Sequence, residues 1–365
     1  MNPSAPLHVR DVGVCPVVVP LPRPIRTAAG AMTEAPLLLI DLGTEEGVTG
    51  RSYLFAYQTL MLKPLADLVA AMGGMITNDS LAPLELASKL RSRFTLLVTR
   101  HLIGMALSGL DMAAWDALGV ATGQPLVKLL GGAAKPLRAY LGNGVGVIPL
   151  AEVPDTAAKL AAEGWPAIKI RLGREAFADD LAAVRAARRS IPDHVALMAD
   201  FNQSLTVVEA IRRGRALDSE GLSWIEEPVR ADDFQGCARV AAAVSTPVQI
   251  GENFSSAFEM HAALRCDASD FVMIDAQQIG GVTGWLAGSA LAQVYGAEVS
   301  SHLFQEASAH LLAVSPTAAW LEYMNVADPI LAEPLRPVGG MITAAQRPGI
   351  GLVWDDRAVQ TYRVA

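Results

Sequence analysis

Three carboxylates recur at a constant interval in the second half of the chain. Asp200, Glu226 and Glu252 are spaced by 26 residues, and they close the apolar runs VALMAD, LSWIE and PVQIGE. Short apolar runs separated by helix-length segments indicate buried parallel strands. In a (β/α) barrel the carboxyl ends of such strands surround one mouth, where three carboxylates would repel one another unless a cation lay between them. Mg²⁺ takes oxygen ligands, so the spacing predicts a metal enzyme.

Two cations accompany these carboxylates on the strand AIKIR. Lys169 and Arg171 are two residues apart and therefore point to the same face, as do Asp200 and Asn202. A single Lys or Arg is usually a solvated surface charge, but this strand is otherwise apolar. We therefore expect both cations to face the mouth and to bind and polarise an anionic substrate.

Further candidates end the later strands. Asp275 closes FVMID and His302 closes AEVSSH, which would be neighbouring strands of a barrel. A carboxylate beside an imidazole fixes its tautomer and raises its basicity, as a general base requires. Glu322 closes AAWLEY, and near a metal-bound carboxylate it would be protonated and donate a hydrogen bond. The alternative is that Glu322 is a surface residue exposed to solvent. Glu227 adjoins Glu226, and the spacing favours Glu226 as the residue facing the axis, with Glu227 making supporting contacts.

The remaining sequence supplies the elements that must position these residues. The first segment combines strands such as APLLLIDLGTEEGVTGRSYLFAY with helical patterns such as GMALSGLDMAAWDALG, which indicates an α+β layer. Residues 22–34 are predicted to be a mobile loop or a plain surface connector. From Leu137 the chain alternates strands and helices, with the strands LRAYLG, PAIKIR, VALMAD, LSWIE, PVQIG, FVMID, AEVSSH and AWLEY. Eight strands favour a barrel; a doubly wound sheet is the alternative, although no GxGxxG turn follows the first strand.

Composition narrows the class of protein. The chain has 365 residues, half of them hydrophobic, with a net charge of −8 and a pI near 5.3, which argues against nucleic acid as a partner. Its three cysteines form no CxxC pair, as expected in a reducing cytoplasm. No signal-peptide pattern opens the sequence, and no uncharged apolar run reaches the ~20 residues that span a bilayer. We expect a cytoplasmic enzyme that does not bind membranes.

As a set, these stretches resemble the enolase superfamily, and within it the mandelate racemase subgroup. The stretches that carry the resemblance are IDLGTEEGVTGRSYLFAY, GLDMAAWDALG, the KxR strand, DFNQSL, WIEEP, GEN, DAQQIGGVTGW, SSHLFQE and WLE. The resemblance implies a (β/α)7β modified TIM barrel with an α+β capping domain. The capping domain would comprise residues 1–135, the barrel 136–328, and residues 329–365 would return to the capping domain. It also implies a homo-oligomer, often an octamer.

The resemblance further implies a reaction. Mg²⁺ would bind Asp200, Glu226 and Glu252, and the α-proton of a small carboxylate substrate would be removed to give an enediolate. Lys169 would bind the carboxylate, Glu322 would donate to the enediolate oxygen, and His302, paired with Asp275, would be the base. The remaining substrate contacts would be Asn202, Ile25, Ala29, Met32, Tyr57 and Leu303. With the exception of Asn202, these residues are largely apolar.

Three departures bear on the reaction. Arg171 stands where mandelate racemases have a second lysine base, and arginine stays protonated. Gln278 replaces another lysine, and LGNGVG lacks a carboxylate-binding serine. One base suffices to dehydrate an acid sugar, so the loss of the second lysine favours dehydration. The apolar cap instead favours a compact apolar or aromatic 2-hydroxy acid, because each buried hydroxyl without a partner costs roughly 1–3 kcal/mol. Racemisation is placed first and dehydration second; a catalytically silent homologue and, last, a two-carboxylate glycosidase remain as alternatives.

Overall fold

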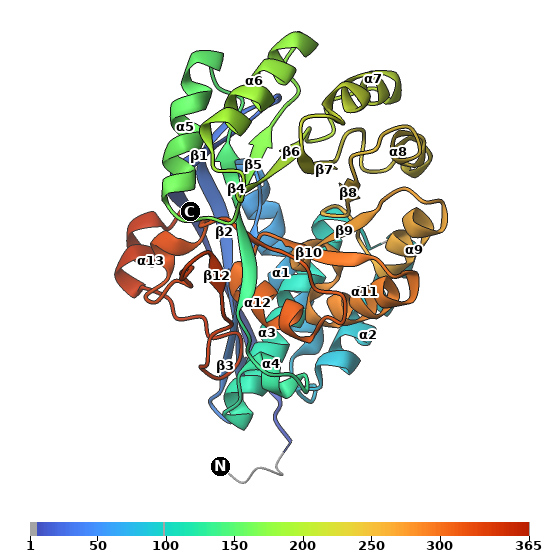
Figure 1. Cartoon of the computed structure of the whole chain (residues 1–365). Coiled ribbons are helices and arrows are strands. Elements are labelled where there is room, and N and C mark those ends of the chain that lie inside the picture. Colours follow the sequence, from blue (N-terminus) through green and yellow to red (C-terminus); the bar gives the residue numbers. More distant parts are fainter. Residues whose placement is uncertain (1–5, 98, 365) are drawn as a thin grey trace.

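The computed structural model describes residues 6–97 and 99–364, so the first five residues of the expected capping domain, residue 98 and residue 365 lie outside it. The chain begins with an antiparallel sheet of β1 (Val9–Thr27), β2 (Gly30–Thr44) and β3 (Thr49–Phe55), in that order. Residues 37–40 of β2 are buried without alternation, because both faces of this sheet are covered. Figure 1 shows these long strands beside the barrel, with the N-terminal helices packed close to them.

Helices follow the sheet and complete the N-terminal unit. They are η1 (Thr59–Met61), α1 (Leu62–Ile76), α2 (Pro83–Arg93), η2 (Thr95–Leu97), α3 (His101–Thr122) and α4 (Leu126–Leu129). α3 packs on β2 and β3 so closely that a side chain at Gly50 would strike its backbone. The stretch Thr59–Ile76 is apolar and long enough to cross a membrane by length and composition. The side chains of Leu62, Leu65, Val69 and Met72 are nevertheless buried, and α1 contacts β1 and α3, as a core helix does.

Residues 22–34 form the tip of the β1–β2 hairpin, so the prediction of a loop was wrong. Ile25 pairs with Met32 and Thr27 with Gly30, beyond an irregularity after Pro20. The tip is attached to the barrel, because the amide of Val147 donates to the carbonyl of Arg26 at 2.9 Å. Inter-strand and cross-domain backbone hydrogen bonds therefore hold a segment whose composition indicates a mobile loop.

The second unit is a parallel barrel, as the sequence predicted. Its strands are β4 (Leu137–Val145), β5 (Ala167–Arg171), β6 (Ala196–Asp200), β7 (Leu222–Glu226), β8 (Val248–Ile250), β9 (Phe271–Asp275), β10 (Glu298–His302) and β11 (Leu321–Tyr323). Neighbours along the chain pair in parallel, and β11 pairs with β4. The amide of Ser301 donates to the carbonyl of Trp320 at 3.0 Å, which brings the segment before β11 against β10 and closes the ring.

Helices alternate with these strands and lie outside the barrel (Figure 1). They are η3 (Leu150–Glu152), α5 (Val153–Ala162), α6 (Phe177–Ser190), α7 (Val207–Leu217), α8 (Phe234–Ala241), α9 (Ala257–Arg265), α10 (Ala276–Ile279), α11 (Gly281–Tyr295) and α12 (Gln305–Val314). Thr206, Asp233 and Ser256 cap α7, α8 and α9 with their side chains, which explains where these helices begin. Gly280, the first residue of the GGVTGW motif, separates α10 from α11 with φ 108°, and the rest of the motif begins α11.

The C-terminal segment lies against both units. It contains η4 (Asp328–Ile330), β12 (Met341–Ile342) and α13 (Asp356–Tyr362). β12 pairs with β4, and the amide of Val364 donates to the carbonyl of Pro16 in β1 at 3.1 Å.

Buried polar groups join the two units. Asp111 of α3 accepts hydrogen bonds from Thr283 of α11, and Glu306 of α12 accepts one from the hydroxyl of Tyr53 in β3 at 2.8 Å. His310 of α12 accepts a hydrogen bond from the amide of Val127. The barrel and the N-terminal unit are therefore bonded to each other next to the barrel mouth.

Candidate active site

Lys169 lies at the centre of a buried carboxylate cluster. Its ammonium nitrogen is 2.7 Å from Glu226, 2.8 Å from Glu322 and 3.3 Å from Asp200, and these carboxylates come from three different strands. All four side chains are fully or almost fully buried. The strand register places Arg171 beside Asp200 and Asp200 beside Glu226, so the carboxyl ends of β5, β6 and β7 align. This cluster contains four of the eight predicted catalytic and metal-binding residues.

The carboxyl groups of this cluster differ in pKa. Burial raises the pKa of Glu226 to about 8, helped by Asp200 and Glu322 against the opposing charge of Lys169. Burial also acts on Glu322, but Lys169 and His302 outweigh it and lower the pKa of Glu322 to about 2. The cations nearest to Glu322 favour its charged form in this arrangement, and its role as a protonated acid beside a metal-bound carboxylate stays a prediction.

His302 and Asp275 form the predicted dyad at the ends of β10 and β9. The two residues are register partners, and Nδ1 of His302 is 2.6 Å from Oδ2 of Asp275. The other oxygen of Asp275 caps α10 by accepting the amides of Gln277 and Gln278. Because Asp275 is held by a helix terminus, it fixes the ring of His302, with Nδ1–H donating to the carboxylate and Nε2 facing away from it.

The free face of His302 is turned toward two more carboxylates. Nε2 is 3.5 Å from Glu252 and 3.8 Å from Glu322. Burial lowers the pKa of His302, but Glu252, Asp275 and Glu322 together raise it to about 10. The surrounding carboxylates therefore favour the protonated imidazolium, and the protonation of His302 depends on how far this negative charge is neutralised.

Arg171 is buried and immobilised. One guanidinium nitrogen donates to the carbonyl of Gly142 at 2.8 Å, and Nε lies 3.9 Å from Asp200 and has no hydrogen-bond partner among the described residues. Asn202 supports Asp200 by donating its amide and its side-chain nitrogen to the carboxylate, at 2.8 and 3.0 Å. Its side-chain oxygen is buried and unpartnered within the described chain.

Glu227 joins three loops at the mouth, in agreement with the supporting role expected from its position. It is buried, and its two oxygens accept the side-chain amides of Asn253 at 2.7 Å and Gln203 at 3.1 Å. Glu227 and Gln203 have positive φ of 40° and 63°, which is unusual for residues other than glycine. Backbone strain of this kind gathers at functional sites.

The residues around Lys169 suit a hard divalent cation. Carboxylates outnumber permanent cations here, and burial together with mutual repulsion raises the pKa of both Glu226 and Glu252. Within residues 6–97 and 99–364, no three acidic, His or Cys side chains converge as ready-made metal ligands. Lys169 holds Asp200 and Glu226, while Glu252 turns toward His302. The all-oxygen donor set and the excess negative charge fit Mg²⁺, which would require these side chains to exchange their present contacts.

A cavity of about 340 Å³ opens beside Glu252, and we call it the inner chamber. On the side of the N-terminal unit it is lined by Ala56, Tyr57, Met61, Leu102 and Met105, and on the barrel side by polar residues. Of the six predicted substrate contacts, only Tyr57 lines it. Ile25 is buried in β1, Met32 is half-buried, and Ala29 is exposed at the hairpin tip. Leu303 is buried and donates its amide to Glu322.

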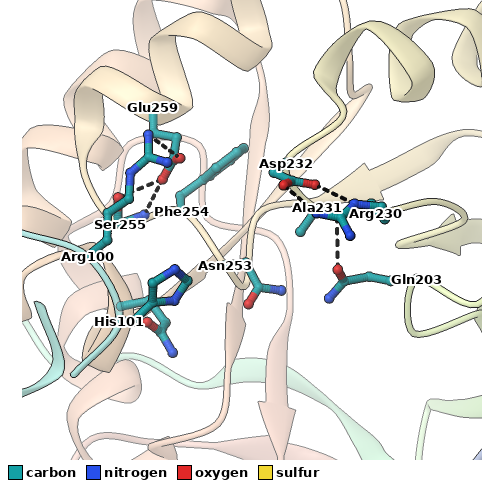
Figure 2. A pocket seen from close by; sticks show the side chains of 11 residues that line it. Arg100, His101, Gln203, Arg230, Ala231, Asp232, Asn253, Phe254, Ser255 and Glu259 are labelled. Carbon is teal, nitrogen blue, oxygen red and sulfur yellow. Dashed lines mark hydrogen bonds and ion pairs between the residues drawn. The ribbon is translucent and has the colours of Figure 1, made fainter. Parts of the chain in front are cut away.

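A second cavity of about 300 Å³, the outer chamber, contains residues that the sequence interpretation missed (Figure 2). The two chambers share His101, Gln203, Asn253 and Gln278. Asn253 follows Glu252 directly and Gln203 lies three residues after Asp200, so their positions after strand ends could have indicated them. His101, at the start of α3, has no such signal, because only the tertiary fold brings it to the barrel mouth.

Comparisons with known proteins agree with this geometry. Residues 9–131 match the mandelate racemase/muconate lactonizing enzyme N-terminal domain, and residues 152–358 match the enolase C-terminal domain-like family. The chain is 34% identical over 255 residues to an L-talarate/galactarate dehydratase of Salmonella typhimurium, covering 69% of this chain and 64% of that protein. It is 30% identical to a 3,6-anhydro-alpha-L-galactonate cycloisomerase of Streptomyces coelicolor, over 92% of this chain and 94% of that protein.

A solved structure is more similar. An enolase from Bradyrhizobium, in complex with magnesium and mandelic acid, is 42% identical and superimposes with a TM-score of 0.95, covering 99% of this chain and 100% of that one. Family models match both units of the fold, and the relatives named here are enzymes. The chain therefore belongs to the enolase superfamily, in its mandelate racemase and muconate lactonizing enzyme subgroup.

Proposed function

We propose that this protein is a Mg²⁺-dependent enzyme that removes the α-proton of a 2-hydroxycarboxylate from one face, with His302 as the base. The observation that carries the proposal is the Asp275–His302 dyad, whose Nδ1–Oδ2 distance is 2.6 Å. It presents Nε2 toward Glu252 and Glu322, beside the carboxylate cluster. Asp200, Glu226 and Glu252 would hold the metal.

Bound Mg²⁺ would neutralise the carboxylates and stabilise negative charge that develops on the substrate. Lys169 is the buried ammonium at the centre of the cluster, and it would contribute a hydrogen bond and positive charge to a substrate carboxylate. Glu322 accepts a hydrogen bond from the amide of Leu303 and contacts Lys169. It is therefore held where a proton could pass between it and the substrate oxygen. Asp275 keeps the His302 ring oriented throughout.

One-sided proton removal supports a lyase reaction, the dehydration of an acid sugar. After taking the α-proton, the imidazolium of His302 would return a proton to a departing β-hydroxyl. The opposite face offers Arg171, whose guanidinium is bonded to Gly142 and is always charged, so it supplies positive charge but accepts no proton.

Racemisation of a compact 2-hydroxy acid is the second candidate. The apolar residues of the inner chamber, Ala56, Met61, Leu102 and Met105, favour it. The mandelic acid bound by the Bradyrhizobium relative supports it as well.

Proton NMR in D₂O with Mg²⁺ distinguishes the two candidates. Both enantiomers of mandelate and of lactate are incubated alongside several acid sugars. A new keto-deoxy acid signal supports dehydration. Deuterium in both enantiomers with loss of optical activity supports racemisation, and exchange in one enantiomer without inversion supports a single base. The proposal would be refuted if no acid gained deuterium at its α-position and calorimetry detected no Mg²⁺ binding.

A further inference from the structure

The inner and outer chambers form one continuous cleft. They share four lining residues, and Glu252 lines only the inner one. If the proposed function is correct, the reacting carboxylate binds beside Glu252, and the adjoining outer chamber offers space for the tail of a longer substrate. Each chamber is at the lower limit of ordinary ligand pockets, so a compact acid needs only the inner one.

The cations of the outer chamber are matched by carboxylates. Arg100 is 3.0 Å from Glu259, and Arg230 is 2.6 Å from Asp232. Glu259 is the best fixed of these groups, because it also accepts the amide and the hydroxyl of Ser255. Figure 2 shows the two ion pairs on opposite walls of the chamber. Within the described residues, each of these two arginines therefore already has a carboxylate partner, although the Arg230–Asp232 pair is largely exposed.

Neutral polar side chains of the outer chamber remain available for hydrogen bonds to a ligand. Asn253 uses its nitrogen on Glu227, which leaves its oxygen as an acceptor. The side chains of Gln278 and His101 make no hydrogen bonds to other described residues, and they lie where the two chambers meet. The side-chain amides of Asn253 and Gln278 carry no charge, so each can pair with a hydroxyl group but cannot neutralise a carboxylate.

We propose that the outer chamber is a subsite for the uncharged, hydroxyl-bearing tail of a monocarboxylic acid sugar. The enzyme would accordingly prefer aldonates to aldarates, whose second carboxylate would meet Glu259 and Asp232 without a free cation. This inference rests on the proposed function and adds the substrate class.

The test compares D-gluconate, D-glucarate and lactate with the Mg²⁺-loaded protein. Binding is measured by calorimetry and α-proton exchange by NMR. Wild-type protein should bind gluconate more tightly than either glucarate or lactate. Gln278→Leu should reduce the preference for gluconate over lactate about three- to tenfold, the value of one neutral hydrogen bond. His194→Leu, at an exposed position remote from the cleft in the sequence, is the matched control and should keep the wild-type ratio.

Asp232→Asn removes the carboxylate that pairs with Arg230. It should increase glucarate binding relative to gluconate about fivefold. Wild-type preference for glucarate, or ratios unchanged in both variants, would overturn the subsite. The binding ratios test the subsite even if no acid exchanges its α-proton. The absence of exchange would instead refute the proposed function.

Discussion

At the scale of single residues, the proposed one-sided removal of the substrate proton depends on two side chains. His302 is oriented by Asp275, which is itself fixed by the start of α10. Arg171 is bonded to the carbonyl of Gly142 and cannot accept a proton. The proposed mechanism therefore has one base, His302, and one fixed cation, Arg171.

His302→Asn should lower α-proton exchange by roughly 10²–10⁴-fold, because asparagine preserves much of the volume but cannot act as the base. Exchange into the preferred substrate is measured by NMR in D₂O. His194→Asn, at an exposed site, is the control. An undiminished rate would assign the base to another residue.

Arg171→Lys should introduce exchange at the second face, because a lysine beside the carboxylate cluster can lose its proton whereas arginine cannot. Polarimetry together with NMR would detect a rise in racemisation above the wild-type rate. In Arg171→Met the positive charge is lost, and a fall in kcat/KM of about tenfold or more is expected. Full activity of the methionine variant would remove Arg171 from the mechanism.

The sequence was sufficient to place the strand-end residues, and insufficient for their charge states. Asp200, Glu226, Asp275 and His302 could be predicted because strands have a two-residue period and end at a common mouth. The ionisation of Glu322 could not, since it depends on its 2.8 Å distance from Lys169 and on the nearby His302. Such distances arise only when strands distant in sequence close into a ring.

At the scale of elements, the loops after β6, β7 and β8 are held together by one carboxylate. Glu227 accepts the amides of Gln203 and Asn253, next to the residues proposed to bind metal. Contacts of this kind orient metal ligands and commonly contribute ten- to hundredfold in affinity.

Glu227→Ala should therefore weaken Mg²⁺ binding roughly ten- to hundredfold, because both amides lose their acceptor. Calorimetric titration with Mg²⁺ measures this directly, without substrate. Glu298→Ala, at the exposed beginning of β10, provides the control. Equal Mg²⁺ affinity in both variants would show that the loops are positioned without Glu227.

The hairpin tip shows where local patterns misled the sequence interpretation. PRPIRTAAGAMTE contains the Pro, Gly and Ala typical of a loop. β1 is an edge strand of its sheet, where proline is tolerated, and Pro22 and Pro24 fall in its irregular stretch. The contact that holds the tip comes from Val147, more than 100 residues later.

At the scale of the whole molecule, His310 connects three parts of the chain. It lies in α12 of the barrel, accepts the amide of Val127, and donates to the carbonyl of Ile350 in the C-terminal segment. Burial lowers the pKa of His310 to about 4. The sequence around His310 carries no pattern that indicates a role, and the structure shows that it is buried.

Protonation of His310 should make the protein acid-sensitive. Its pKa is lower in the folded state than the ordinary value near 6.5, so the unfolded chain binds the proton first as the pH falls. Its contribution should be constant above about pH 6.5, and the free energy of unfolding should decline between pH 6.5 and 4 by up to about 3 kcal/mol.

Urea unfolding of wild type and His310→Gln at several pH values measures this effect. Glutamine can replace both hydrogen bonds but does not titrate, so the difference in stability between the two proteins should shrink as the pH falls. Parallel stability curves would contradict the prediction.

The architecture itself was predictable because it rests on repeated patterns. Eight apolar runs separated by helices specify a barrel, and their order along the chain is the order of the sheet. The cleft was not predictable, because His101 and Gln278 meet only after the two units pack together. Homo-oligomerisation and a cytoplasmic location remain predictions from the sequence and the resemblance.

The attachment of the β1–β2 hairpin to the barrel has a consequence for traffic through the site. The tip lies over the loops after β4 and β5, where Arg26 and Ala28 leave no room for side chains at Gly146 and Gly173. The two chambers lie on the other side of the mouth, and the inner one, beside Glu252, is lined by Tyr57 and Met61 of the N-terminal unit. Substrate and product should therefore exchange on this side, between the N-terminal unit and the loops that follow β6, β8 and β9. Enlarging a side chain on the chamber side, such as Met61→Trp, should slow exchange more than enlarging one at the exposed hairpin tip, such as Ala29→Trp.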